Sequence, residues 1–169
     1  RDIKPANIAF TGRGEVKVLD FGLAKMMLPM GPGADEDTRT QSQTVPGTVL
    51  GTVRYMSPEQ VRGEATDTRS VLVSLGVVLY EMAAGRPPIA GSSTFDTQEA
   101  IDNRQPEPPG EINDAVPPEL ERNILQGLQK DREHRYQTPR DLLVDLRNLQ
   151  RSDSGSVTVM PPRRKSRKL

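Results

Sequence analysis

Residues 70–84 constrain the fold most, because this run is apolar on nearly every face of a helix. A helix that is apolar all round has to be buried among other parts of the chain. Gly85 follows the run directly, with Pro87 and Pro88 close behind, and these residue types end helices. The sequence therefore predicts a buried helix over 70–84.

Two further stretches downstream have the pattern of helices. Pro117 and Pro118 open an amphipathic stretch that runs to Leu128. Thr138 and Pro139 open another helix, in which four leucines share one stripe. The members of this stripe are Leu142, Leu143, Leu146 and Leu149. We expect these leucines to belong to the core rather than to a binding site.

Near the start of the chain, two short extended stretches flank a turn. Residues 7–10 and 15–19 read as strands, and the residues between them read TGRG. The resulting β-hairpin holds Asn7 and Asp20 at one edge. Taken together, the patterns predict a fold that is mainly α with a small β-hairpin.

The composition fits an ordinary soluble domain. The chain has 169 residues, with 23 acidic and 23 basic side chains, and no apolar run of about eighteen residues that could cross a membrane. It has no cysteine, so disulfides and thiolate metal sites are excluded, which suits a reducing cytoplasm. The acidic cluster 35–37 lacks further ligands at a defined spacing, and we interpret it as solvated loop.

Three short motifs follow one another in a fixed order. Residues 1–7 read RDIKPAN, residues 20–22 read DFG and residues 57–59 read SPE. With the hairpin between the first two motifs, this order resembles the C-terminal lobe of the protein kinase family. The residues Lys4 and Thr52 resemble those that Ser/Thr kinases of that family carry at these positions, and they differ from the pattern of tyrosine kinases. The chain as a whole resembles the eukaryotic-like bacterial type of Ser/Thr kinase.

The resemblance implies a site for phosphoryl transfer from ATP to Ser or Thr hydroxyls of protein substrates. In such a site, the protein positions the reacting oxygens and neutralises negative charge. By resemblance, Asp2 is the catalytic base, Lys4 contacts the γ-phosphate, and Thr52 bonds both of them. Asn7 and Asp20 are the implied ligands of Mg²⁺, which prefers oxygen donors. The implied cofactors are therefore ATP and Mg²⁺.

Residues 20–59 lose periodicity and are rich in Gly, Pro, Ser and Thr, as in a long loop. By resemblance, this stretch is the activation segment of a kinase. Thr44 and Thr48 lie nearest to the position that the family phosphorylates, and autophosphorylation is one source of such a phosphate. Arg1 is the basic partner expected for it. The alternative is that these hydroxyls are merely solvated.

Two further expectations concern structural residues. By resemblance, Glu59 forms an ion pair with Arg135. Val71 stands where the family usually carries an Asp whose carboxylate accepts hydrogen bonds from the catalytic loop. Because valine accepts none, buried donors would stay unpaired at roughly 1 to 3 kcal/mol each, and we expect the loop around Asp2 to loosen.

The chain ends in a polar stretch, 151–169, whose basic run follows Pro161 and Pro162. Its low hydrophobicity predicts a disordered tail. A basic run of this kind is solvated or contacts anionic lipid, and no aromatic platform supports nucleic acid as a partner. The tail is similar to the juxtamembrane segment of bacterial Ser/Thr kinases, which implies a cytoplasmic domain whose parent protein is anchored by a span beyond Leu169.

The resemblance covers residues 1–150 as a partial kinase domain, with the small lobe absent from this chain. No glycine-rich phosphate loop, and no strand lysine in its usual context, is found in the sequence. We therefore expect the isolated chain to be inactive. Two hypotheses stay open: a Ser/Thr protein kinase, or a pseudokinase or truncated remnant that acts as a binding module.

Overall fold

The computed structural model describes residues 3–19 and 51–155. In this part of the chain, helices dominate and the strands form one two-stranded sheet, so the prediction of a mainly α fold with a small β-hairpin is confirmed. The first region holds a 3-10 turn and the two strands: η1 (Pro5–Asn7), β1 (Ile8–Phe10) and β2 (Val16–Val18). The second holds the helices: α2 (Pro58–Val61), α3 (Thr68–Ala84), α4 (Thr94–Asn103), α5 (Pro109–Ile112), α6 (Pro118–Gly127), η3 (Arg132–His134) and α7 (Pro139–Gly155).

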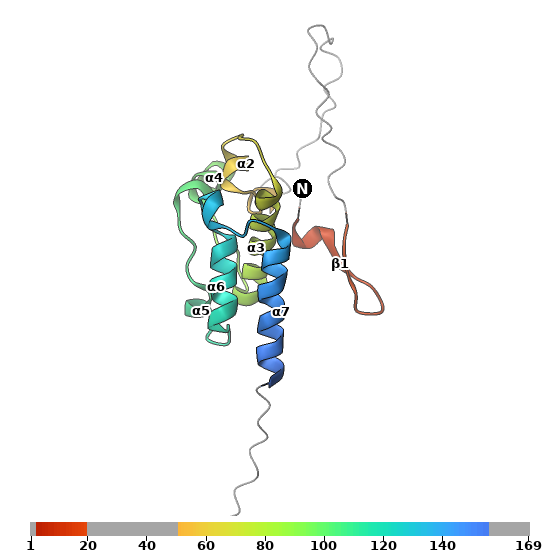
Figure 1. Cartoon of the computed structure of the whole chain (residues 1–169). Helices are drawn as coiled ribbons and strands as arrows, with labels where there is room; N and C mark the ends of the chain where they lie inside the picture. Colours follow the sequence, from red (N-terminus) through yellow and green to blue (C-terminus); the bar gives the residue numbers. More distant parts are fainter. Residues whose placement is uncertain (1–2, 20–50, 156–169) are drawn as a thin grey trace, which may run out of the picture.

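The long helix α3 is the buried helix that the sequence predicts. It begins after Asp67, whose side chain accepts a hydrogen bond from the backbone of Arg69, and it ends at Gly85 in the left-handed conformation, with φ of 73°. In Figure 1, α6 and α7 run side by side next to α3. Helix α3 approaches α6 so closely that a Cβ atom on Gly76 would lie 3.3 Å from the side chain of Leu128.

The main hydrophobic core joins α3 to α6. Its buried members are Val73, Val77, Tyr80, Ile124 and Leu128. Tyr80 and Ile124 have no exposed surface, and the hydroxyl of Tyr80 donates to the carbonyl oxygen of Glu107 at 2.8 Å. This buried phenol therefore has the polar partner that it needs.

A second core cluster joins α3 to α7, and the expectation that Leu143 belongs to the core is wrong. Leu142 packs with Leu72 and Tyr136, and Leu146 lies partly buried against them. Leu143, which we expected in the same stripe, is 44% exposed. Successive residues of a helix differ by about 100° in direction, so two adjacent leucines cannot both face one neighbour.

The hairpin has the predicted architecture. Strands β1 and β2 pair antiparallel, with Ile8 opposite Val18 and Phe10 opposite Val16. Gly14 closes the turn with a positive φ of 79°. Figure 1 shows the hairpin, in red, at one side of the helices.

Among the described helices, none combines the length and apolar character that a membrane crossing requires. The terminal residues from 156 onward lie outside the described part of the chain, so the prediction of a disordered, membrane-proximal tail stays a prediction.

Candidate functional site

Six of the residues that the sequence singles out lie in the described part of the chain. They are Lys4, Asn7, Thr52, Glu59, Val71 and Arg135. The others lie outside the described residues: Arg1, Asp2, Asp20, Thr44 and Thr48. The geometry of the site is therefore built from the first group.

The structure brings Lys4 and Thr52 together. The amine of Lys4 donates a hydrogen bond to the hydroxyl oxygen of Thr52 over 3.2 Å, although 48 positions separate the two residues. Lys4 has an extended backbone just before η1, and its side chain is partly buried at this contact. The contact joins the RDIKPAN motif to the stretch that precedes SPE.

Asn7 is fixed by the backbone of both ends of the hairpin. Its N–H donates to the carbonyl oxygen of Lys4 at 2.9 Å, and its carbonyl oxygen accepts from the N–H of Leu19 at 2.6 Å. Leu19 directly precedes Asp20 in the chain. The strand pairing therefore anchors the start of the first strand to the residue before the DFG motif. No cluster of three or more acidic, His or Cys side chains that could bind a metal occurs within residues 3–19 and 51–155.

Glu59 and Arg135 form the ion pair that the sequence predicts. Two guanidinium nitrogens of Arg135 donate to the two carboxylate oxygens of Glu59, at 2.8 and 2.9 Å, and neither side chain is exposed. The hydroxyl of Ser70 donates to the same carboxylate at 2.6 Å. Burial by itself raises the pKa of Glu59, but the hydrogen bonds from Arg135 and Ser70 outweigh it and hold the pKa at about 2. Glu59 is therefore a buried carboxylate that stays charged.

Two further N–H groups of Arg135 have backbone partners. Its Nε donates to the carbonyl oxygen of Gln129 at 2.6 Å, and one terminal nitrogen donates to the carbonyl oxygen of Lys130 at 2.8 Å. A buried ion pair is stable only where such further hydrogen bonds offset the loss of solvation. The pair thus ties α2, which holds Glu59, to the chain that links α6 and α7.

Helix α3 holds the segment between Thr52 and Glu59 at two more points that the sequence analysis missed. The hydroxyl of Ser74 donates to the carbonyl oxygen of Tyr55 at 2.7 Å. The hydroxyl of Tyr55 donates to the carboxylate of Glu81 at 2.7 Å. Ser70 and Ser74 are hydroxyl residues one turn apart in an apolar helix, and that spacing is the signal that could have found them.

Val71 is half-buried in the first turns of α3, between Ser70 and Leu72. Its expected effect concerns the loop around Asp2, which lies outside the described residues. The loosening of that loop stays a prediction.

Comparison of the sequence with known proteins shows the family to which the chain belongs. The family described as protein kinase domain matches residues 1–144. A probable serine/threonine-protein kinase of Streptomyces coelicolor, SCO3848, is 40% identical over 146 residues. The serine/threonine-protein kinase PknB of Mycolicibacterium smegmatis is also 40% identical, again over 146 residues. A probable serine/threonine-protein kinase of Corynebacterium efficiens, CE0033, is 38% identical over 156 residues.

These matches cover 86 to 90% of this chain but only 20 to 22% of the relatives. The chain therefore spans about a fifth of the length of the curated relatives that it matches. Because the family match extends over most of the chain, this protein belongs to the protein kinase domain family and is similar to its bacterial Ser/Thr kinases.

Proposed function

We propose that this chain supplies the substrate-side half of a catalytic site that transfers the γ-phosphoryl group of ATP to Ser or Thr hydroxyls of proteins. The observation that carries the proposal is the hydrogen bond from Lys4 to Thr52. It gathers two residues of the predicted catalytic set from distant parts of the chain, as a phosphoryl transfer site requires.

In this proposal, Asp2 accepts the proton of the substrate hydroxyl and Lys4 stabilises the charge on the transferred phosphoryl group. Thr52 holds the amine of Lys4 in position. Asn7 and Asp20 would hold Mg²⁺, because amide and carboxylate oxygens are the hard donors that this ion prefers. When bound, Mg²⁺ would neutralise negative charge on the triphosphate.

Regulation and location extend the proposal. Phosphate on Thr44 or Thr48, including phosphate from autophosphorylation, would pair with Arg1 and order the activation segment over 20–59. The domain would work in the cytoplasm, with the basic tail over 151–169 close to an anionic membrane surface and the parent protein anchored by a span beyond Leu169.

A second candidate is a binding module without catalysis, a pseudokinase or remnant. The observation that favours it is Val71, which offers no acceptor to the catalytic loop. The sequence also lacks a glycine-rich phosphate loop, so we expect the isolated chain to bind ATP weakly.

A thermal-shift titration with ATP and Mg²⁺ separates the two candidates. A ligand that binds only the folded state raises the melting temperature, so the kinase proposal expects a rise at millimolar nucleotide that requires Mg²⁺. The matched variant Asn7→Leu should abolish the dependence on Mg²⁺ and keep the fold. If the melting temperature of the wild-type chain does not respond to nucleotide with or without the metal, the binding-module candidate is favoured for this chain.

A further inference from the structure

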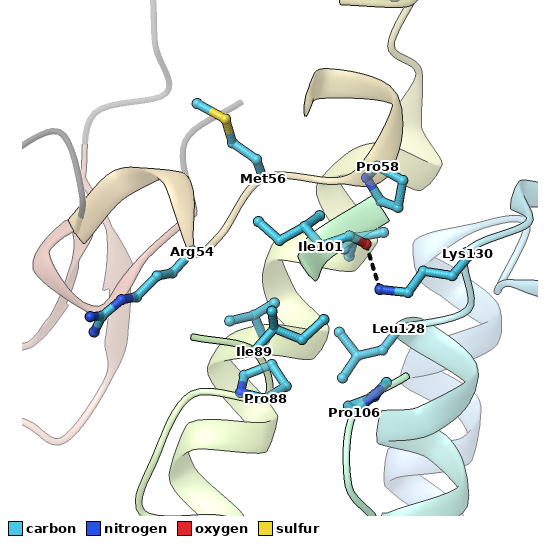
Figure 2. Close-up of a pocket in the computed structure, with 11 residues that line it drawn as sticks. Arg54, Met56, Pro58, Pro88, Ile89, Ile101, Pro106, Leu128 and Lys130 are labelled. Carbon is cyan, nitrogen blue, oxygen red and sulfur yellow. Dashed lines mark hydrogen bonds between the residues drawn. The ribbon is translucent and has the colours of Figure 1, made fainter. Parts of the chain in front are cut away.

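A small apolar cavity lies beside the segment that follows Thr52. It opens between α3, α4 and the end of α6, and Figure 2 shows Met56, Ile89, Ile101 and Leu128 on its walls. The cavity is partly open to solvent, and about 20 Å³ of it is available to the centres of water molecules. A space of this size accepts about one water molecule or a small chemical group.

The amine of Lys130 lies in this apolar surrounding. Figure 2 shows the side chain of Lys130 extending toward α4, where the amine donates to the carbonyl oxygen of Ile101 at 2.5 Å. This carbonyl belongs to the last turn of α4, so the contact also caps the helix. The structural role needs one N–H donor and does not need a charge.

The positive charge on this amine is poorly compensated. Within residues 3–19 and 51–155, no carboxylate lies at ion-pair distance from Lys130, and the nearby carboxylate of Asp102 is itself bonded by Arg62 at 2.5 Å. Arg135 is a second cation close to the amine, whereas Arg54 points its guanidinium away from it in Figure 2.

The pKa of Lys130 is lowered to about 8, mainly by burial; the carboxylate of Asp102 opposes this shift, and the charge of Arg135 adds to it. Near neutral pH, the neutral and nucleophilic form of this amine is therefore more populated than that of an ordinary exposed lysine.

We propose that Lys130 is a site of Nε-acylation by small acyl donors, acyl phosphates or acyl thioesters. In the step, the amine lone pair attacks the carbonyl carbon of the donor and a C–N bond forms. The bond from that carbon to the phosphate oxygen, or to the thiol sulfur, breaks, and phosphate or thiolate leaves with the electron pair. The amine loses one proton to water.

Three features of the cavity fit the product. The amide that forms keeps an N–H for the carbonyl oxygen of Ile101. Its short alkyl group enters the apolar space between Ile89 and Leu128. Its neutrality removes a half-buried charge next to Arg135, whose guanidinium is bonded to the carbonyl oxygen of Lys130 and to Glu59.

The test uses the whole chain and an internal comparison. The folded chain is incubated with acetyl phosphate in one arm and with acetyl coenzyme A in the other, and acetylation of each lysine is followed by peptide mass spectrometry. Lys17, exposed on β2, is the reference amine. Because amines of exposed lysines are almost fully protonated at pH 7.5, we expect Lys130 to react at least about tenfold faster in at least one arm.

Two controls make the result decisive. In 8 M urea, the advantage of Lys130 over Lys17 should vanish, because it depends on the folded cavity. The variant Ile89→Phe fills the cavity and should slow acetylation of Lys130 without changing that of Lys17. Equal rates for the two lysines in the folded chain, in both arms, would overturn the proposal, and so would an advantage of Lys130 that persists in urea.

Discussion

The hairpin region over 3–19 and the helical body over 51–155 are built differently. In the body, Tyr80 and Ile124 are fully buried in a shared core. In the hairpin, Phe10 and Val16 face each other across the strands, yet they are 74% and 60% exposed. Apolar side chains of the body are buried in its own core. Among the described residues, the apolar side chains of Phe10 and Val16 in the hairpin are largely exposed.

The two regions differ in what stabilises them and in the proposed site residues that they carry. The body has a core, helix caps and a buried ion pair, all of which resist unfolding. The hairpin region carries Lys4 and Asn7, and a hydrogen bond from Lys4 to Thr52 joins it to the body. In the proposed site, Lys4 and Asn7 therefore lie in the less buried region, and Thr52 of the more buried region bonds the amine of Lys4.

Breaking the ion pair that anchors the body should change the stability of the chain more than any other variant considered. The variant Arg135→Ala leaves the buried carboxylate of Glu59 with the hydroxyl of Ser70 but without its bidentate guanidinium partner, and we expect the free energy of unfolding to fall by about 3 to 5 kcal/mol. Urea unfolding measures it. The control is Arg104→Ala, which removes an exposed pair with Glu99 and should cost less than about 1 kcal/mol. Similar losses for both variants would mean that burial does not make the pair of Glu59 with Arg135 more important than an exposed pair.

A second pair of variants compares the two regions directly. Ile124→Ala empties part of the core and should cost about 2 to 5 kcal/mol. Phe10→Ser, on the exposed face of the hairpin, should change the unfolding free energy by no more than about 0.5 kcal/mol. If Phe10→Ser destabilised the chain as much as Ile124→Ala, the hairpin would be packed in a way that its exposure does not reveal.

The dependence of stability on pH follows from Glu59. Its pKa is lower in the folded state, about 2, than the ordinary value of 4.5, so the unfolded chain binds this proton more tightly. The contribution of Glu59 is complete above about pH 4.5 and is lost as the pH falls towards 2. Urea midpoints at pH 5 and pH 3 measure the loss.

The double variant Glu59→Gln with Arg135→Met is the control for this pH effect, and its midpoint should change less between the two pH values. Exposed carboxylates such as Glu64 and Asp67 also have a lowered pKa, but solvent screens their pairs. A wild-type midpoint that is equal at pH 5 and pH 3 would contradict the account of this ion pair.

The smallest effect concerns Val71. Restoring a carboxylate with Val71→Asp should raise the melting temperature, since each hydrogen bond regained by a buried donor is worth about 1 kcal/mol. Val71→Leu, which adds no acceptor, is the matched control and should give no such rise. An unchanged or lower melting temperature for Val71→Asp would mean that the catalytic loop is held by other contacts.

The parts of the fold that the sequence predicted are those with a strong local pattern. Helix α3 is continuously apolar and ends at a glycine, and the hairpin has a turn between two short strands. Helix α4 escaped prediction because it buries only Thr97, Ala100 and Ile101 among polar residues. Its position depends on packing against the body, which no local pattern records.

Local sequence patterns predicted less of the candidate site than of the fold. The pairing of Glu59 with Arg135 came from family resemblance, because a contact across 76 positions leaves no local signal. The hydroxyls of Ser70 and Ser74 were overlooked within an apolar run. The state of Lys130 could not be predicted, since its lowered pKa arises from burial by segments distant in sequence.

In the proposed function, the site gathered by the contact between Lys4 and Thr52 transfers phosphate. The most direct measurement is phosphate incorporation into Ser and Thr peptides by the product of the complete reading frame with ATP and Mg²⁺. We expect transfer to both hydroxyls and a loss of at least about 100-fold in the variant Asp2→Asn. Transfer that is unchanged by Asp2→Asn, or no transfer by the wild-type protein, would contradict the proposed function.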